Sequence, residues 1–460
     1  MDFDTIAAIA TAPGEAGIGI VRISGDRALD ISDKIFKSER ISSLTKEEER
    51  KLVYGHIINP KDKKIIDEVL IVYMKGPNTY TKEDVVEINC HGGIVPVRRI
   101  LELVLENGAR MAEAGEFTKR AFLNGRIDLA QAEAVMDLIS AKTDSGFDVS
   151  LNQLEGSLSK KVKDLREKLL SMLAQIEASI DFPEHDVEDS TYRKLMDGGK
   201  EVYQEIDGLL DTVYTGRILK EGLKTVILGK PNVGKSSLMN ALLRENRAIV
   251  TDVPGTTRDV IEEYINIKGI PLKIIDTAGI RETNDVVEKI GVDRAKELIN
   301  MSDLTITVFD ASRELSDEDL EIIKLIENKK SIILLNKTDL DNKIDKKDIS
   351  KHIPDKKIIN TSVIKGDGVD ILEDTLKDMF FTGEVKINDN IIVNNVRHRN
   401  QLLKAKKDIE DAIEAIKAGL PIDLFEVDIK NCWENLGEIT GDTVGEDIIE
   451  KIFKDFCIGK

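Results

Sequence analysis

The spacing of apolar residues near the N-terminus predicts a mixed α and β domain. Short apolar runs of strand type occur at residues 17–24, 69–74 and 85–89. Residues 94–105 have the apolar spacing of a helix, so residues 1–118 are expected to form a compact α+β domain. Two charged residues, Arg22 and Glu87, interrupt the apolar strands. Each is either a salt-bridged surface residue or part of a ligand site, and the strand pattern alone leaves both interpretations open.

From about residue 119 the chain has the pattern of long helices, in which apolar residues recur seven positions apart from Leu151 onward. Its two rows consist of Leu151, Leu158, Leu165 and Met172, and of Val162, Leu169 and Ile176. Pro183 interrupts the pattern, and residues 192–213 resume it. The apolar positions there are Leu195, Tyr203, Ile206, Leu210 and Val213. Such rows are far more often the core of a helical bundle than a surface for a coiled-coil partner.

Between two helical stretches, strands and helices alternate along the chain. Residues 223–381 show the alternation that a doubly wound sheet requires, and the predicted fold class is therefore a multidomain α/β protein. Helical spacing returns at 391–416, 424–436 and 447–456. The simplest interpretation is one helical domain, made of residues 119–222 and 382–460, into which the α/β domain is inserted.

The sequence GKPNVGKS, at residues 229–236, fits the phosphate-binding loop pattern G-x-x-x-x-G-K-[ST]. It follows a strand-like run at 224–228 and precedes a helix start at 237–243, which is the setting that the motif requires. Its glycines allow backbone N–H groups and the helix N-terminus to approach a phosphate chain. Lys235 then supplies a positive charge to the β and γ phosphates, and the Ser236 hydroxyl can coordinate Mg²⁺.

Two motifs after the phosphate loop have the order expected of a GTPase. In TDVPGTTRD, Thr256 and Thr257 stand where a switch loop would close on Mg²⁺. In DTAG, Asp276 stands where the water shell of Mg²⁺ would lie, and the N–H of Gly279 is free to meet a γ-phosphate. Together with the phosphate loop, these motifs predict a nucleoside triphosphatase.

The motif NKTD, at residues 336–339, follows an apolar strand at 331–335 and selects the base. A carboxylate can accept two hydrogen bonds from guanine, whereas adenine has no donor at N1, so Asp339 favours GTP over ATP. The second base-side loop, TSV at 361–363, keeps only part of the usual serine-alanine-lysine pattern. The expected GTP contacts are Asn232, Val233, Gly234, Lys235, Ser236, Ser237, Thr251, Asp252, Val253, Pro254, Gly255, Thr256, Thr257, Asp276, Thr277, Ala278, Gly279, Asn336, Lys337 and Asp339.

One position departs from Ras-type GTPases, in which a glutamine after the DxxG glycine orients the attacking water. Here that residue is Ile280, which has no hydrogen-bonding group, so the water must be oriented from elsewhere. The acidic candidates just downstream are Glu282, Asp285 and Glu288. No arginine finger is obvious, although Arg258 and Arg281 are candidates. A second cation would also neutralise charge between the phosphates, and the Asn232 amide oxygen and the switch-loop carbonyls are suitable ligands for it.

Composition limits the class of protein. A chain of 460 residues exceeds what one core usually organises, and a net charge of −19 argues against a general nucleic-acid coat protein, although a local basic patch stays possible. No apolar stretch approaches the roughly 18 residues needed to span a bilayer, and the acidic N-terminus does not resemble a signal peptide, so a cytoplasmic protein is expected. The cysteines, Cys90, Cys432 and Cys457, and the five histidines show no metal-ligand spacing.

The whole chain resembles the MnmE (TrmE) tRNA-modification GTPases. The resemblance runs from residue 6 to residue 460 and rests on GKPNVGKS, TDVPGTTRD, DTAGIRE, VEINCHGG, GEFTKRAFLNGRIDLAQAEAV and the terminal FCIGK. It implies an N-terminal tetrahydrofolate-binding-like domain that dimerises, a helical bundle domain and an inserted Ras-like P-loop GTPase domain, the G domain. With the FAD-dependent partner MnmG, in a heterotetramer, such a protein adds an aminomethyl or carboxymethylaminomethyl group to carbon 5 of the wobble uridine of certain tRNAs. The one-carbon unit would come from 5-formyltetrahydrofolate or a related reduced folate.

The resemblance also implies roles for individual residues. Potassium would be held by Asn232, Thr251, Val253 and Thr256, and magnesium by Ser236 and Thr257. Bound K⁺ would drive association of the G domains in the GTP state, and Glu288 matches the glutamate that orients water. The implied folate contacts are Arg22, Glu87, Arg126 and Lys460. Cys457 is implied to be important for the modification, but no adjacent base marks it as a nucleophile.

Two other classes of function are alternatives to a K⁺-activated GTPase of tRNA modification. The first is a molecular switch, for example in ribosome assembly, with no folate chemistry. The second is a GTP-binding scaffold that does not hydrolyse GTP. Failure to bind 5-formyltetrahydrofolate would favour the first alternative, and hydrolysis that does not respond to K⁺ would favour the second.

Overall fold

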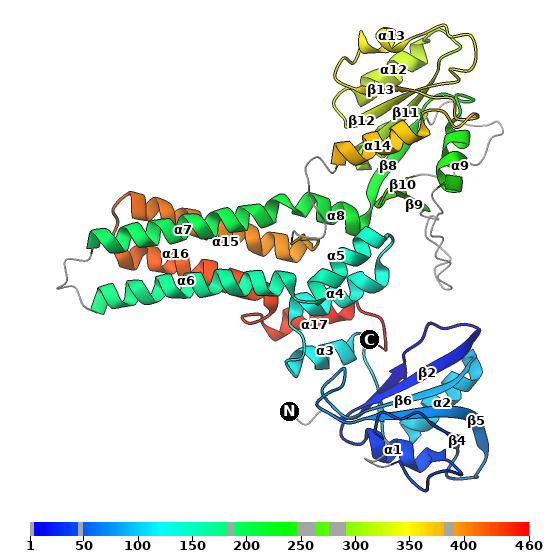
Figure 1. Ribbon diagram of the computed structural model, residues 1–460, viewed down its shortest axis with the longest axis vertical. Coiled ribbons are helices and arrows are strands. Elements are labelled where there is room, and N and C mark those ends of the chain that lie inside the picture. The colour runs from blue at the N-terminus through cyan, green and yellow to red at the C-terminus, as the bar shows by residue number, and fades with distance from the viewer. Residues whose placement is uncertain are drawn as a thin grey trace. The chain divides into compact units, whose positions relative to one another are not determined.

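The N-terminal part of the chain folds around a seven-stranded sheet with the order β3-β4-β5-β6-β2-β1-β7. The computed structural model describes residues 4–44, 49–181, 188–245, 263–275, 291–380 and 391–459 (Figure 1). The strands are β1 (Ile6–Ile9), β2 (Ala16–Ser24), β3 (Phe36–Lys37), β4 (Val53–Ile58), β5 (Ile65–Met74), β6 (Val85–Gly92) and β7 (Arg110–Met111). Neighbours are antiparallel except β1 and β7. The strands predicted at 17–24, 69–74 and 85–89 are confirmed.

Two helices, α1 (Ala28–Ile35) and α2 (Ile94–Glu106), pack on one face of this sheet. Alternate strand residues such as Val21 and Ile88 point to that side and form the core with the apolar faces of both helices. The strand residues of opposite parity include exposed apolar side chains, with Ile18, Tyr54 and Leu70 showing 60%, 43% and 40% of their surface. The sheet therefore has one covered face and one face that carries exposed apolar residues.

The helical part comprises nine helices among the described residues. They are α3 (Glu116–Leu123), α4 (Leu129–Ser140), α5 (Asp144–Leu154), α6 (Ser157–Asp181), α7 (Glu188–Asp211), α8 (Val213–Glu221), α15 (Val396–Lys417), α16 (Ile422–Thr440) and α17 (Glu446–Lys454). Helix α17 packs on α3 and α4 through an apolar cluster that contains Phe453 and Leu129. Helix α7 contacts α15, where Asp207 pairs with Lys406 at 2.5 Å, and α16, where the ring edge of Tyr192 meets Phe425. Helix α7, from before the inserted domain, thus contacts helices α15 and α16 from after it.

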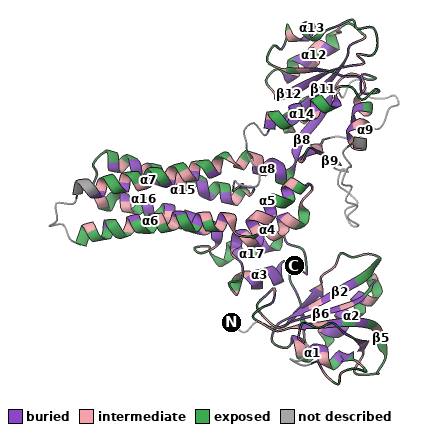
Figure 2. Ribbon diagram, viewed as in Figure 1, coloured by how far each residue is buried: buried purple, intermediate pink, exposed green. Residues whose placement is uncertain are grey.

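The buried rows of the long helices differ in two places from the sequence prediction. The row that was expected to run from Leu151 through α6 is interrupted, because α5 ends at Leu154 and Gly156 has a φ of +94°. Leu151 is accordingly only half-buried on a separate helix. In α7 the buried apolar residues are Leu195, Val202, Ile206 and Leu209. The expected Tyr203 and Leu210, and Val213 at the start of α8, are only half-buried, so they are wrong as core positions. Figure 2 shows buried and exposed positions alternating along α7.

The inserted domain is built on a six-stranded sheet with the order β13-β12-β11-β8-β10-β9, parallel except for the β9–β10 pair. Its strands are β8 (Leu223–Leu228), β9 (Glu263–Ile267), β10 (Ile270–Ile274), β11 (Leu304–Asp310), β12 (Ser331–Asn336) and β13 (Lys357–Asn360). Its helices are α9 (Lys235–Glu245), α11 (Gly291–Met301), α12 (Asp317–Ile326), α13 (Lys346–Ser350) and α14 (Val369–Phe380). Separate apolar cores lie on the two faces, one with α9 and α14 and the other with α11, α12 and α13, as a doubly wound sheet requires.

The chain separates into two compact units by its internal contacts. One consists of residues 1–136, 159–167 and 433–460, and the other of residues 137–158 and 168–432. Within the described ranges, none of the helices combines the length and the apolar composition needed to cross a membrane.

Replacing Leu169 by alanine tests the buried row of α6. The Leu169 side chain is fully buried, and its neighbour Leu170 leaves 55% of its surface exposed. We expect Leu169→Ala to lower the free energy of unfolding by about 2–5 kcal/mol through lost burial and a residual cavity. Urea unfolding followed by far-UV circular dichroism measures the change. Leu170→Ala, with the same atoms removed, should change stability by less than about 0.5 kcal/mol, and an equal loss in both variants would contradict the assigned helix face.

Candidate functional site

The phosphate-binding motif at residues 229–236 forms a loop between β8 and α9, called the phosphate-type loop below. Its backbone has the conformation that its glycines permit. Gly229 has a φ of +144°, and a Cβ there would lie 2.4 Å from the carbonyl oxygen of Val308. Gly234 has a φ of +109°, and a Cβ there would lie 2.2 Å from Nδ2 of Asn336. Asn232, at the exposed tip of the loop, also has a positive φ, of +65°. Neither glycine position can hold a side chain, so the loop conformation explains the motif.

Lys235 and Ser236 begin helix α9 directly after this loop. The ammonium of Lys235 donates hydrogen bonds to the carbonyls of Gly229 and Lys230, each at 2.7 Å. Burial lowers the pKa of Lys235, because desolvation disfavours its charged form. The lysine therefore already spans the loop in which a phosphate chain would lie, and an anion there would stabilise its charge.

Asn336, at the end of β12, connects the phosphate-type loop to the base-side loop. Its Nδ2 donates to the carbonyl of Val233 at 2.8 Å, and its Oδ1 accepts from the backbone N–H of Val363 at 3.2 Å. The side chain is almost fully buried. This single amide therefore fixes how far the two loops lie from each other.

The carboxylate of Asp339 is exposed and lies beside the loop 361–363. The Ser362 hydroxyl donates to Asp339 Oδ1 at 2.7 Å, and this hydrogen bond is the main cause of the lowered pKa of Asp339. The carbonyl of Thr361 accepts hydrogen bonds from the N–H and the hydroxyl of Thr338. The TSV loop thus lies against NKTD although its sequence is only a partial match to the usual pattern. Asp339 is charged and oriented where a base with two donors could bind.

Asp310 is a part of this site that the sequence analysis missed. It ends the buried strand β11, and its Oδ2 lies 2.6 Å from Nζ of Lys337. Burial alone would raise the pKa of Asp310, but hydrogen bonds from Lys337 and Ser312 outweigh it and lower the pKa. The pair fixes the position of the Lys337 ammonium. An acidic residue at the carboxyl end of a buried parallel strand was the signal available in the sequence.

Several predicted residues lie outside the described part of the chain. They are the switch residues Thr251, Asp252, Val253, Pro254, Gly255, Thr256 and Thr257, the DTAG residues Asp276, Thr277, Ala278 and Gly279, the neighbouring Arg258, Ile280, Arg281, Glu282, Asp285 and Glu288, and the C-terminal Lys460. Among the residues that the structure does describe, no group of three or more histidine, cysteine, aspartate or glutamate side chains could hold a metal ion. The predicted Mg²⁺ and K⁺ ligands Ser236 and Asn232 are both on the loop described above.

A second cluster lies in the N-terminal domain, where Arg22 on β2 and Glu87 on β6 are register partners. Nε of Arg22 lies 2.8 Å from Oε1 of Glu87, and its Nη1 donates to the carbonyl of Gly459 at 3.4 Å. The guanidinium of Arg126 lies 4.7 Å from the ring centroid of Tyr80, and that of Arg22 lies 5.9 Å from it. Two of the four predicted folate contacts, Arg22 and Arg126, therefore lie over one aromatic ring, and a third, Glu87, pairs with Arg22.

Arg120 is on helix α3, whose Thr118 hydroxyl hydrogen-bonds the hydroxyl of Tyr80, and it was not identified in the sequence. Only 2% of its side chain is exposed, and it donates to Glu83, Glu116 and Asp4. Burial alone would raise the pKa of Glu116, but hydrogen bonds from Arg110, the Glu113 N–H and Arg120 lower it. The spacing of Glu116 and Arg120 by four residues in GEFTKRAF was the available signal.

The three cysteines differ in accessibility. Cys90 and Cys432 are buried, and burial raises the pKa of both thiols, to about 11 for Cys90. Cys457 is exposed, and the segment that carries it is held in place because its carbonyl accepts from the N–H of Gly115 at 3.3 Å. Only Cys457 is thus open to a reactant.

Two family models together match nearly the whole chain, and curated relatives match it over 99% of its length. The family model of the MnmE helical domain matches residues 129–457, and that of the GTP-binding protein TrmE N-terminus matches residues 5–126. The chain is 65% identical to the tRNA modification GTPase MnmE of Alkaliphilus oremlandii and 61% identical to that of Alkaliphilus metalliredigens, each over 99% of both chains. The MnmE of Clostridioides difficile is 56% identical, also over 99% of both chains. Among solved structures, the G domain of the T. maritima FeoB iron transporter matches at 27% identity over 34% of this chain and 97% of that chain, with a TM-score of 0.26.

Replacing Asp339 by asparagine tests base selection. Asparagine keeps the shape but cannot accept both guanine donors, so we expect GTP affinity to fall at least about tenfold. The amide can instead donate to the C2 oxygen of xanthine, so affinity for xanthosine triphosphate should rise. Titration with fluorescent nucleotide analogues measures both. Ser362→Ala, which removes only the side chain that orients Asp339, should keep the preference for GTP. An asparagine variant with the same preference would contradict the assigned role.

Proposed function

Because the chain belongs to the MnmE family of tRNA modification GTPases, we propose that it is a K⁺-activated GTP hydrolase that installs a modification on carbon 5 of the wobble uridine of certain tRNAs. Its GTP hydrolysis and its part in tRNA modification follow from the family. The finer assignments concern the cations, the folate and the partner protein. The described residues offer chemistry that supports the cations and the folate, and the partner protein is proposed from the family resemblance.

The observation that carries the GTPase assignment is the bridge made by Asn336 between the phosphate-type loop and the base-side loop. On one side of it, Lys235 and the loop N–H groups would hold the β and γ phosphates. On the other, Asp339 would accept from the guanine N1–H and amino group. The remaining proposed GTP contacts are in the segments 251–257 and 276–279, beyond the described residues.

The described donors fit the two proposed cations. Ser236, half-buried at the start of α9, offers a hydroxyl oxygen of the kind that Mg²⁺ accepts, and Thr257 would complete that pair. Asn232, exposed at the loop tip, offers an amide oxygen for K⁺ beside the carbonyls or side chains of Thr251, Val253 and Thr256. When bound, the monovalent cation would neutralise charge that develops between the phosphates, which an arginine does in other GTPases. Glu288 would orient the attacking water.

The N-terminal cluster supports a reduced folate as the one-carbon donor. A folate has a flat pterin ring and carboxylates, which match the aromatic face of Tyr80 and the guanidinium groups of Arg22 and Arg126. Glu87, paired with Arg22, offers a carboxylate that can accept pterin N–H groups. Lys460 and Cys457 would complete the site from the C-terminus, where Gly459 already contacts Arg22. The proposed ligand is 5-formyltetrahydrofolate or a related reduced folate.

The proposed assembly is a homodimer through the N-terminal domains, which joins the FAD-dependent MnmG in a heterotetramer in the cytoplasm. The exposed apolar residues Ile18, Tyr54 and Leu70 on one face of the sheet support the dimer, because exposed apolar residues favour association. The assembly would add an aminomethyl or carboxymethylaminomethyl group, with MnmG supplying the flavin.

Hydrolysis in KCl compared with NaCl at equal ionic strength tests the cation and the water. We expect the purified protein to release phosphate at least about tenfold faster in KCl, because a cation held by Asn232 would lower the barrier by charge neutralisation. Glu288→Ala should lower the K⁺-stimulated rate about a hundredfold or more, with GTP affinity unchanged. The matched variants Glu282→Ala and Asp285→Ala should keep most of the rate. Equal rates in the two salts would instead support a scaffold or an arginine-based mechanism.

Calorimetric titration of the full-length protein with 5-formyltetrahydrofolate tests the folate site. Each of Arg22→Ala and Arg126→Ala removes a charge-assisted contact, so the affinity should fall about tenfold or more, with GTP hydrolysis unchanged. Arg98→Ala is the matched control, because it removes an equal charge from the exposed surface of α2. If the wild-type protein binds no folate, the folate assignment is wrong and a GTPase switch without folate chemistry becomes the better interpretation.

A further inference from the structure

Two lysine pairs lie side by side at one edge of the inserted domain. Lys329 and Lys330 immediately precede β12, and Lys356 and Lys357 lie at the start of β13. The two strands are parallel neighbours, with Ile332 in register with Lys357. Because parallel strands begin at the same edge of a sheet, the chain delivers both pairs to one place. That edge is opposite the carboxyl ends of the strands, which carry the phosphate-type loop and NKTD.

These lysines line a depression of about 600 Å³. Its lining residues are Glu327, Asn328, Lys329, Lys330, Ser331, Pro354, Asp355, Lys356, Lys357 and Met379. The volume is within the range of small-molecule sites, but such sites are mainly apolar, and here Met379 and Pro354 are the only apolar side chains in the lining. The charged side chains, four lysines against Glu327 and Asp355, point to an anionic ligand instead.

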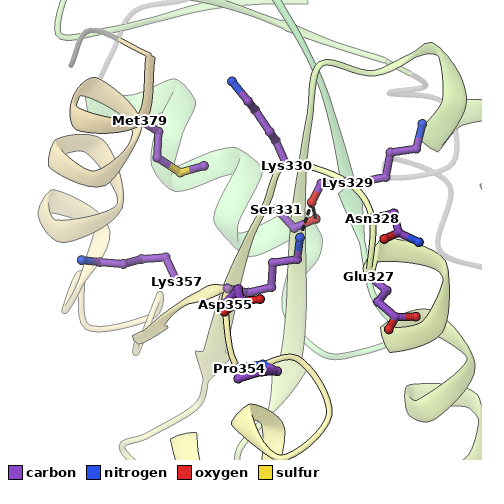
Figure 3. A pocket seen from close by; sticks show the side chains of 10 residues that line it. Glu327, Asn328, Lys329, Lys330, Ser331, Pro354, Asp355, Lys357 and Met379 are labelled. Atoms are coloured by element: carbon purple, nitrogen blue, oxygen red, sulfur yellow. Dashed lines mark hydrogen bonds between the residues drawn. The ribbon is translucent and has the colours of Figure 1, made fainter. Parts of the chain in front are cut away.

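The ammonium groups of Lys329, Lys330 and Lys357 are available to such a ligand. Within the part of the chain that the structure describes, none of the four forms an ion pair with a carboxylate. Lys356 donates to the carbonyl of Lys329 at 2.6 Å, which holds the two pairs together. Lys330 lies 5.0 Å from the ring centroid of Tyr214 and 5.1 Å from that of Phe380, so its position is fixed by aromatic faces. Figure 3 shows Lys329, Lys330 and Lys357 extending in different directions around the depression.

We propose that this lysine rim, defined as Lys329, Lys330, Lys356 and Lys357, binds the sugar-phosphate backbone of the RNA substrate. Ammonium groups that diverge suit successive phosphates of a polyanion better than one small anion, which would need them to converge. The chain as a whole has a net charge of −19, so RNA can approach only where positive charge is concentrated locally. The proposal rests on the proposed function in tRNA modification. It places RNA contact at the sheet edge away from GTP, so both can bind together.

Binding of an unmodified tRNA transcript to the full-length protein, measured by fluorescence anisotropy over a salt series, tests the rim. The variant combines Lys329→Gln, Lys330→Gln and Lys357→Gln, and Lys356 is kept because it holds the turn. We expect about tenfold or more weaker binding near 0.1 M salt. The negative slope of log affinity against log salt should become shallower by about 2–3, since each lost phosphate contact contributes roughly 0.7–0.9. GTP hydrolysis should stay at the wild-type rate.

Two matched variants separate the rim from general charge and from packing. Lys343→Gln, Lys346→Gln and Lys347→Gln together remove the same charge from exposed positions at and before α13, and should leave tRNA affinity within about twofold. Replacing the three rim lysines by arginine keeps the charge and should retain binding. The proposal is overturned if the rim variant binds tRNA like the wild type, if the α13 variant weakens binding equally, or if the wild type shows no affinity. Such a result leaves the K⁺ and folate tests, which need no RNA, unaffected.

Discussion

The buried amide of Asn336 holds the nucleotide site together. Phosphate and base would be bound by loops that follow different strands, β8 for the phosphate-type loop and β12 for NKTD. The amide donates to Val233 on one side and accepts from Val363 on the other. Because a buried amide must satisfy its hydrogen bonds, the two loops cannot drift apart without leaving it unpaired. The absent Cβ of Gly234 gives this amide its room, so the motif glycine and the motif asparagine depend on each other.

The N-terminal cluster follows the same principle with a charge in place of an amide. Arg120 is buried and makes charge-assisted hydrogen bonds to three carboxylates, of which Glu83 and Glu116 are themselves largely buried. A network of this kind is stable only when every member is paired, so it fixes the backbone around it. That backbone carries Tyr80 and leads to Arg126. In both domains, an inaccessible polar group therefore positions the exposed residues that would contact a ligand.

The sequence predicted local features well and long-range ones poorly. The motifs GKPNVGKS and NKTD could be identified from the sequence. The first needs glycine at fixed positions for its backbone conformation, and the second lies directly at the end of an apolar strand. The contact of Arg22 with Gly459 joins residues 437 positions apart, and no spacing rule reports such a contact. Only the family resemblance assigned Arg22 and the C-terminal Lys460 to one site. In α7 the core row was shifted because Gly199 occupies a buried position. Glycine does not register as apolar, so the pattern appeared to continue through Tyr203 instead of Val202.

In the inserted domain, the two ends of the parallel strands carry different chemistry. At the carboxyl ends of the strands, loops and a helix N-terminus present N–H groups to an anion that must bind and leave with each turnover. At the opposite edge, lysines precede β12 and β13 and meet no such constraint. Positive charge can therefore accumulate there without disturbing nucleotide exchange. The negative net charge of the chain thereby repels RNA from most of its surface, and RNA contact is concentrated at the lysine rim.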